Sequence, residues 1–395
     1  MKKILIIGAG FLQDFVICKA KEMGYETLAV DLDPNAIGFT HADKYKVIDI
    51  VDERACLKYA QEENVDGVLT AATDYGVLTS SFIAEKMGLR GIPYSVAKLI
   101  KNKYLIRKCL YENHVDDTAK CYEVDCNTNI EELISKLTFP VMVKPSDGSG
   151  SRGTTRVNQP EKFMDACHKA LVCSLIERAE IEPFISGVEY GAESLVIDGQ
   201  VHVMSIMKKN MTLPPYFAEL GHAIPSELSP KLEDKAVQCV KNAIKALGIT
   251  CGSVNIDMLI SEDGKIFIID VGARMGGNMI GPCIIPYGTG LNYLENMIRN
   301  AVGDPIVWIQ DSHEAVASRL LAFNKSGVVK NIPDFHVLEE DFDVEIYHHL
   351  HVGDFINEYH TNIDGCGYII AKRSSVKEAE SVCAEVLNEI GRQIF

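Results

Sequence analysis

The first hundred residues alternate short apolar runs with amphipathic stretches of helical length. This alternation is typical of parallel strands that are joined by crossover helices. It predicts a wound α/β domain at residues 1–100. The strands are expected at residues 3–7, 27–31, 46–50 and 67–71.

Residues 95–113 carry apolar side chains at helical spacing beside a row of basic side chains. We expect one amphipathic helix whose basic face is exposed to solvent. The basic residues are Lys98, Lys101, Lys103, Arg107 and Lys108.

The pattern changes at about residue 139, where strands and hairpins replace the β/α alternation. We expect a strand at 140–144, hairpins at 187–207 and 253–271, a helix at 229–247 between them, and a functional loop at 208–225. The last ninety residues predict a smaller α+β unit, with strands at 315–324, 342–347 and 367–371 and a helix at 375–390. The expected domains are residues 1–100, 101–305 and 306–395.

The composition narrows the class of protein. The chain of 395 residues has 39 Lys and Arg against 55 Asp and Glu, a net charge of −16 that disfavours nucleic acid as a partner. No apolar run approaches the ~20 residues of a membrane span. The 12 cysteines include no Cys-x-x-Cys pair, and most lie in apolar patterns such as those around Cys18, Cys109, Cys239 and Cys251. They predict reduced core thiols in a cytoplasmic protein.

The turn Gly8-Ala9-Gly10-Phe11-Leu12-Gln13 after the first strand suggests a dinucleotide site, with Asp31 as the ribose ligand. Gln13 stands where the fingerprint has its third glycine. An NAD(P)-dependent oxidoreductase is therefore one alternative.

Lys144 ends a strand and is followed by a Gly/Ser loop at residues 146–153. Backbone N–H groups of such a loop can surround phosphate groups, and the lysine can contact them. The loop lacks the Gly-Lys-Ser/Thr ending of a Walker motif.

The second hairpin carries Asp257 on one strand and Asp270 on the next. Antiparallel pairing would place the two carboxylates side by side, where they suit Mg²⁺ bridged to phosphate oxygens. Arg274 follows four residues after Asp270 and is suited to hold the oxygens of a transferring phosphoryl group.

Taken in order, these segments resemble the ATP-grasp superfamily of carboxylate–amine ligases over about residues 1–305. The resemblance implies a wound parallel-sheet N-terminal domain, an ATP-clamping central domain and a C-terminal α+β lid. It also implies that Lys103 and Lys144 contact ATP phosphates beneath a loop containing Ser146, Gly148, Ser149 and Gly150. Glu182 to Ile185 would contact adenine, Glu189 the ribose, Asp257 and Asp270 the Mg²⁺ (with Mn²⁺ as a substitute), and Arg274 the acyl phosphate.

The family often has Glu at the metal positions and Asn two residues after the second, where this chain has Gly272. Asn255 or Asn278 is the available replacement for the missing amide. The stretch at 207–226 resembles the branch of L-amino-acid (dipeptide) ligases and carbamoyl-phosphate-synthase-like ligases. The resemblance implies that Glu219 and His222 line an amino-acid pocket.

We therefore expect an ATP-dependent ligase that joins a small carboxylate, such as an amino acid, to an amine through an acyl phosphate. Its partners would be small molecules and a second copy in a homodimer, not nucleic acid or a membrane. The alternatives within the family are phosphoribosylglycinamide-synthetase-like and biotin-carboxylase-like ligases. A nucleotide-binding module without turnover is the alternative outside catalysis, suggested by Gly272.

Overall fold

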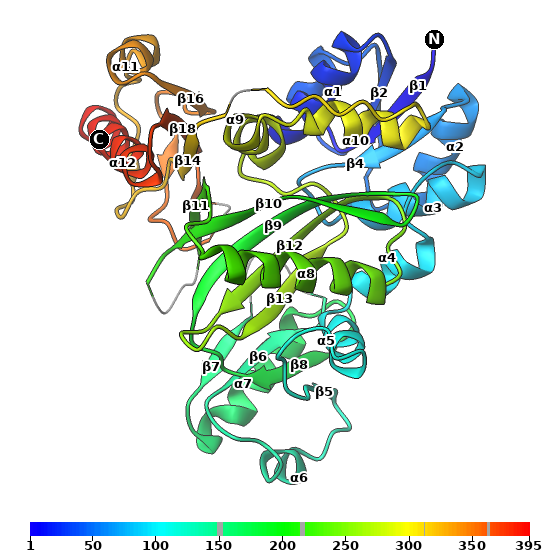
Figure 1. Cartoon of the computed structure of the whole chain (residues 1–395), viewed down its shortest axis with the longest axis vertical. Coiled ribbons are helices and arrows are strands. Elements are labelled where there is room, and N and C mark those ends of the chain that lie inside the picture. The colour runs from blue at the N-terminus through cyan, green and yellow to red at the C-terminus, as the bar shows by residue number, and fades with distance from the viewer. Residues whose placement is uncertain (148–152, 214–217, 312, 362–363) are drawn as a thin grey trace.

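A computed structural model describes residues 1–147, 153–213, 218–311, 313–361 and 364–395. Its first domain is a four-stranded parallel sheet in the order β3-β2-β1-β4 (Figure 1). Helices separate the strands along the chain, as the alternation predicts. The elements are β1 Lys3–Ile7, α1 Phe11–Glu22, β2 Glu26–Asp31, η1 Ile37–Thr40, β3 Lys44–Val47, α2 Glu53–Glu63, β4 Gly67–Thr70 and α3 Gly76–Met87.

The single helix expected at residues 95–113 is wrong, because the chain forms two helices there. These are α4 (Tyr94–Ile100) and α5 (Lys103–Glu112). Asn102 begins α5 by accepting a hydrogen bond from the backbone N–H of Leu105, which is a typical N-cap. The break places Lys103 at the first position of α5.

A second, small antiparallel sheet has the order β5-β8-β6-β7 and lies at the bottom of Figure 1. Helix α7 packs against it through Phe163, Cys167 and Ala170. The sequence pattern gave only β6 of these elements. They are β5 Tyr122–Val124, α6 Ile130–Ile134, β6 Val141–Pro145, β7 Thr155–Val157, η2 Pro160–Lys162, α7 Phe163–Cys173 and β8 Ala179–Pro183.

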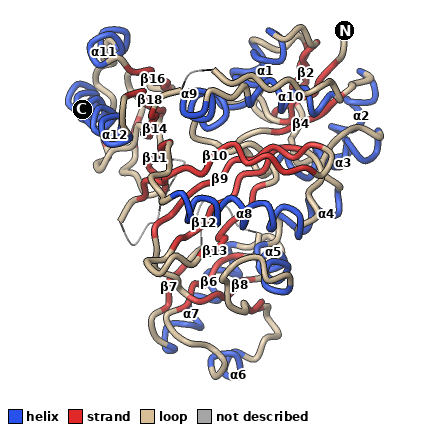
Figure 2. The backbone as a smooth tube through the Cα atoms, viewed as in Figure 1, coloured by secondary structure: helices blue, strands red, loops and turns tan. Residues whose placement is uncertain are grey.

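The third sheet is antiparallel, has eight strands, and continues from the central part of the chain into its C-terminal part (Figure 2). The order is β13-β12-β9-β10-β11-β14-β18-β16. The pairing of β11 with β14 joins the two parts, so the expected C-terminal unit adds strands to the central sheet. The strands are β9 Val188–Ile197, β10 Gln200–Met211, β11 Glu219–Ile224, β12 Gly252–Ile260, β13 Ile266–Gly272, β14 Ala315–Leu320, β16 Val344–His348 and β18 Gly367–Arg373.

Helices cover this sheet through apolar stripes. Val240, Ala243 and Ile244 of α8 pack on β10, and Ala379, Cys383 and Val386 of α12 pack on β14 and β18. Helix α10 joins the sheet to α1 of the N-terminal domain. The remaining elements are α8 Pro230–Ala246, η3 Ile280–Ile284, α9 Ile285–Thr289, α10 Tyr293–Val302, β15 Gly327–Val328, α11 Phe335–Phe342, β17 Phe355–Ile356 and α12 Val376–Ile394.

The expected loop at residues 208–225 is also wrong. Strand β10 continues to Met211, and Glu219–Ile224 form β11. The register pairs Lys209 with His222, so both side chains are held by the sheet. Residues 214–217 lie outside the described part of the chain.

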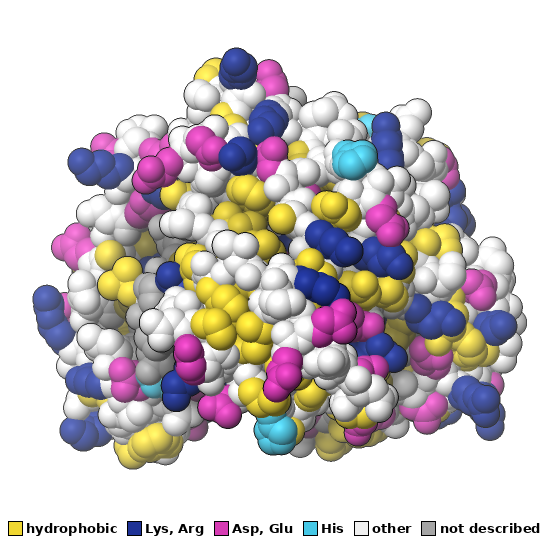
Figure 3. Space-filling model, turned by 90° about the horizontal axis from the view of Figure 1, so that it is seen from below, with side chains coloured by type: hydrophobic (Ala, Val, Ile, Leu, Met, Phe, Trp, Pro, Cys, Tyr) yellow, Lys and Arg dark blue, Asp and Glu magenta, His cyan; other side chains and the backbone are white. Residues whose placement is uncertain are grey.

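Basic and acidic side chains are interspersed on the face shown in Figure 3, and no continuous basic patch covers it. Among the described residues, none of the helices combines the length and the apolar character that a membrane span needs.

Candidate active site

The two aspartates of the second hairpin are direct cross-strand partners, as predicted. Each lies against a lysine: Nζ of Lys103 is 2.6 Å from Oδ1 of Asp270, and Nζ of Lys209 is 2.9 Å from Oδ1 of Asp257. Burial alone would raise the pKa of Asp270, but Lys103 and Lys144 hold this pKa at about 2. The pair is therefore a half-buried acidic site whose charge is balanced by lysines.

Arg274 follows β13 and points toward the N-terminal domain. Its Nε lies 3.0 Å from Oδ1 of Asp74, in the loop after β4. Burial opposes the charge of Arg274, but Asp74 keeps its pKa above the ordinary value. This ion pair connects the central sheet to the N-terminal domain.

One cavity, partly open to solvent, brings these groups together. Lys101 and Asp74 enter it from the N-terminal side, and the paired aspartates and Arg274 enter it from the central sheet. The described residues that line it are Asp74, Val77, Ile100, Lys101, Lys103, Asp147, Asn255, Asp257, Asp270, Val271, Gly272, Ala273 and Arg274.

Lys144, expected to contact phosphate, forms an ion pair with Glu182 on the neighbouring strand. The carboxylate of Glu182 also lies 2.8 Å from Nε of the buried Arg107. Ser146 is fully buried, its carbonyl accepts a hydrogen bond from the backbone N–H of Lys103, and its Oγ has no partner among the described residues. Gly148, Ser149 and Gly150 lie outside the described residues, and Ile185 follows β8 in a half-buried position.

Glu219 and His222 lie together on β11, with Nδ1 of His222 3.1 Å from Oε1 of Glu219. Lys209 connects this pair to the aspartates, since its Nζ is 3.1 Å from Oε2 of Glu219. It also lies 3.8 Å from Oε2 of Glu189. Burial raises the pKa of Glu189 to about 7. Thus Lys209 joins the predicted ribose residue, the metal residue Asp257 and the substrate pair in one network.

A family model for the ATP-grasp domain matches residues 137–282, and a model for the L-amino acid ligase C-terminal domain 2 matches residues 319–393. The first match spans the segment from Lys144 to Arg274 that carries the site. The chain belongs to the ATP-grasp ligase family. Members of this family are ATP-dependent C–N ligases, as the sequence resemblance implied.

Curated relatives of this ATP-grasp ligase have different activities. The formate-dependent phosphoribosylglycinamide formyltransferase of Methanocaldococcus jannaschii is 27% identical over 279 residues, 67% of this chain and 68% of that protein. Human carnosine synthase 1 is 22% identical over 320 residues, which are 73% of this chain but 38% of that protein.

Solved structures have the same fold over almost the whole chain. The L-amino acid ligase from Bacillus licheniformis superposes with a TM-score of 0.84 at 23% identity, covering 99% of this chain and 98% of that one. The phosphoribosylglycinamide synthetase from Anaerococcus prevotii gives 0.79 at 24% identity, covering 100% and 98%. The parallel N-terminal sheet and the antiparallel central and C-terminal sheet are thus those of the ATP-grasp fold, as predicted.

Among the residues of the ATP-grasp site that were not predicted from the sequence are Asp74, Arg107 and Lys209. Asp74 follows the carboxyl end of β4, where wound sheets present ligand-binding residues. Arg107 was assigned to a solvated helix face, which is wrong because the residue is 3% exposed. It lies four residues after Lys103, in phase with the buried Ile106 and Leu110.

The donor set of the hairpin fits a hard divalent cation. Asp257 and Asp270 offer carboxylate oxygens side by side, and the amide of Asn255 lines the same cavity. Mg²⁺ and Mn²⁺ prefer such oxygen ligands. ATP-grasp enzymes in general use ATP and Mg²⁺.

The groups of the alternative dinucleotide site are already engaged. Gln13 donates a hydrogen bond to the carbonyl of Ala71, and its side chain lies within 3.3 Å of where a Cβ of Gly8 would be. Asp31, the expected ribose ligand, accepts a hydrogen bond of 2.8 Å from the backbone N–H of Ala9. The glycine turn is therefore filled by the protein's own side chains.

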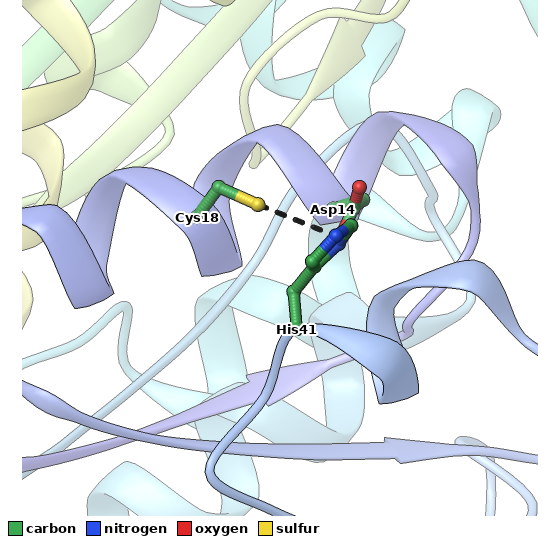
Figure 4. A group of neighbouring side chains, drawn as sticks. All are labelled: Asp14, Cys18 and His41. Atoms are coloured by element: carbon green, nitrogen blue, oxygen red, sulfur yellow. Dashed lines mark hydrogen bonds and ion pairs between the residues drawn. The ribbon is translucent and has the colours of Figure 1, made fainter.

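Figure 4 shows a separate group of side chains, Asp14, Cys18 and His41, on the N-terminal domain. Nδ1 of His41 lies 2.8 Å from Oδ1 of Asp14, and Sγ of Cys18 lies 3.8 Å from the same oxygen. Cys18 is exposed, so its assignment to the core is wrong, whereas Cys239 and Cys251 are buried as expected. None of these three side chains lines the cleft cavity.

Proposed function

We propose that the protein uses ATP to activate a small substrate carboxylate, such as that of an amino acid, and joins it to an amine. The observation that carries this proposal is the ion-pair network from Asp257, the cross-strand partner of Asp270, through Lys209 to Glu219 and His222. It connects the predicted metal residue Asp257 to the carboxylate and the imidazole of the predicted substrate pair.

In the proposed reaction, a carboxylate oxygen of the first substrate attacks the γ-phosphorus of ATP, and ADP leaves. The amine nitrogen of the second substrate then attacks the acyl carbon, phosphate leaves, and the nitrogen loses a proton. Arg274 would stabilise the charge that develops on the transferring phosphoryl group and on the acyl oxygen. Mg²⁺, held by Asp257 and Asp270, would neutralise phosphate oxygens when bound.

His222 is the neutral base of this proposal. Burial lowers its pKa below the ordinary value, and the positive charge of Lys209 acts in the same direction against the opposing effect of Glu219. The imidazole is therefore uncharged at neutral pH and can accept the proton that the amine loses. A backbone hydrogen bond to Oγ of Ser318 on β14 fixes its place.

The names of the phosphoribosylglycinamide enzymes indicate a phosphorylated substrate. Such a substrate would need free cations on the N-terminal side of the cavity. The groups present there are Asp74 and Lys101. Nζ of Lys101 donates to the backbone carbonyl of Asp74 and lies 5.3 Å from the centre of the Tyr75 ring. With its carboxylate on Arg274, Asp74 favours an unphosphorylated substrate that carries its own positive charge, such as an α-ammonium group.

The test is to incubate the protein with Mg-ATP and pools of amino acids and to measure ADP, AMP and phosphate. ADP and phosphate that appear only with a particular pair of acids support the ligase. AMP and pyrophosphate would exclude an acyl phosphate. Tight ATP binding without turnover in any pool would favour the nucleotide-binding module, and turnover only with a phosphoribosyl amine would favour the rival ligase.

The setting of the enzyme is also proposed. Eight of the twelve cysteines are buried, which suits a reducing compartment and supports a cytoplasmic location. A homodimer is proposed because enzymes of this size are commonly symmetric dimers. Cell fractionation and light scattering of the purified protein test these two points.

A further inference from the structure

Asn255 lies opposite Gly272 in the β12–β13 register, beside the pair Asp257 and Asp270. Because alternate residues of a strand share a face, Asn255 and Asp257 project to the same side. All four residues line the cleft cavity. We propose that Asn255 supplies, through its Oδ1, the amide oxygen of the divalent-cation site, and that Glu193 is the positioning residue that orients it. This inference rests on the metal-dependent reaction proposed above.

The orientation of the amide follows from its contact with Glu193. This carboxylate is fully buried on β9, and its Oε2 lies 3.0 Å from Nδ2 of Asn255. Nδ2 of Asn255 donates this hydrogen bond, so the amide presents its NH₂ group to Glu193. The carbonyl oxygen of the planar amide is then turned away from Glu193. Oδ1 accepts no hydrogen bond from a described residue, which leaves it available to a cation.

Glu193 is itself held in place by other donors. It accepts hydrogen bonds from the hydroxyl of Tyr293 and from the backbone N–H of Gly276, at 3.2 Å to Oε2. Gly276 follows Arg274 by two residues, and a Cβ there would lie 2.9 Å from Nδ2 of Asn255 and 3.0 Å from Oε2 of Glu193. One buried carboxylate therefore fixes both Asn255 and the turn that carries Arg274.

Arg274 explains why the amide is not on β13. An ideal Cβ on Gly272 would lie 3.0 Å from Cζ of Arg274 and 3.1 Å from one of its terminal nitrogens. A side chain at position 272 would therefore force the guanidinium to shift. Placing the amide on the partner strand provides the oxygen ligand and leaves room for Arg274.

Asn278, the other replacement considered from the sequence, has a different partner. Its Nδ2 donates to Oε1 of Glu219, and its backbone lies in the left-handed region with φ of 51°. It does not line the cavity of the two aspartates. Its amide therefore interacts with the predicted substrate residue Glu219 and not with the two aspartates.

The test measures Mn²⁺ binding by the electron paramagnetic resonance signal of the free ion, with a non-hydrolysable ATP analogue and no substrates. Asn255→Ala is expected to weaken Mn²⁺ binding at least tenfold, and Glu193→Gln to weaken it about tenfold through misorientation of the amide. Asn278→Ala is the matched control and should bind Mn²⁺ like the wild type. Asp257→Asn is the positive control for loss. Affinity for the analogue in EDTA should be equal in all variants.

Wild-type Mn²⁺ affinity in Asn255→Ala, beside its loss in Asp257→Asn, would overturn the proposal. So would a loss in Asn278→Ala that Asn255→Ala does not show. If Asn255→Ala does not fold, Glu193→Gln decides, because it preserves side-chain shape; unchanged Mn²⁺ binding in that variant would then refute the assignment. Because the readout needs no turnover, an inactive protein with these metal affinities would contradict the proposed ligase and leave this inference standing.

Discussion

Replacing Gly272 by Asn puts the common family residue into this chain and has a definite expected result. If Gly272 meant only that a metal-binding asparagine had been lost from this position, the variant would regain the ligand and gain activity. The structure predicts a loss, because the guanidinium of Arg274 occupies the space into which the new side chain must extend.

The magnitude follows from the contact distances. The Cβ alone would lie 3.0 Å from Cζ of Arg274, and the amide group adds three more heavy atoms beyond it. Arg274 must therefore move, and its ion pair with Asp74 is broken. Displacing a catalytic group by about 1 Å costs roughly a hundredfold in rate. We expect kcat to fall about a hundredfold, which corresponds to about 3 kcal/mol in the activation free energy.

Gly272→Ala is the graded control, since it adds the Cβ without the amide. The guanidinium then has to shift by only a few tenths of an ångström. An off-rotamer side chain costs about 0.5–1.5 kcal/mol, so kcat should fall roughly two- to tenfold.

Both variants are assayed by phosphate release at saturating substrate, together with calorimetric titration of the nucleotide. Nucleotide affinity should remain near the wild-type value, because Lys103 and Lys144 are untouched. Activity of Gly272→Asn equal to or above the wild type would refute the reasoning. It would show that catalysis does not depend on the position of the Arg274 guanidinium seen in the structure.

Three further results are expected. Arg274→Ala should lower kcat by about 10²–10³ with little change in nucleotide affinity, and weakened nucleotide binding would show that its role is misassigned. Arg107→Met should lower the free energy of unfolding in urea by about 3–5 kcal/mol, because Glu182 loses a buried partner, whereas the exposed neighbour Lys108→Met should change it by less than about 0.5 kcal/mol. Burial raises the pKa of Glu193 to about 7 from an ordinary value of 4.5, so stability that is complete at low pH should fall by about 3 kcal/mol as pH rises from 4.5 through 7. Glu193→Gln should flatten this dependence in urea titrations at pH 5 and 8, and an unchanged slope would contradict the assignment.

The parts of the fold that follow from local pattern were predictable. The β/α alternation gave the strands of the N-terminal sheet, with β3 displaced by two to three residues, and the Asp-Gly turns gave both hairpins of the central sheet. The strands β5, β7 and β8 were missed, because they are short and pair with strands that are not their immediate neighbours in a tight hairpin. Strand β11 was missed for the same reason, since it is held between β10 and β14.

The residues of the site also fall into those that a local pattern predicts and those that depend on contacts between distant segments. Asp257 and Asp270 were predictable as a pair, because an antiparallel hairpin is a local structure. Lys209 was not, because the strand was expected to end at Met207. Had the strand been extended, the alternation of buried Met207 and Lys209 would have indicated an inward-facing lysine. Asp74 meets Arg274 only through the packing of two domains, for which the sequence pattern has no signal.

The cleft also revises the charge argument made from composition. The resemblance assigns Lys103, Lys144 and Arg274 to phosphate groups, so they would be the local positive charge of an acidic protein. In the structure each of them faces a carboxylate: Asp270, Glu182 and Asp74. A nucleotide must therefore compete with the protein's own acids, and Lys103 can turn to a phosphate only if another cation neutralises Asp270. By linkage, a divalent cation and the nucleotide should each strengthen the binding of the other. Equal nucleotide affinity with and without Mg²⁺ would show that these ion pairs do not control access to the site.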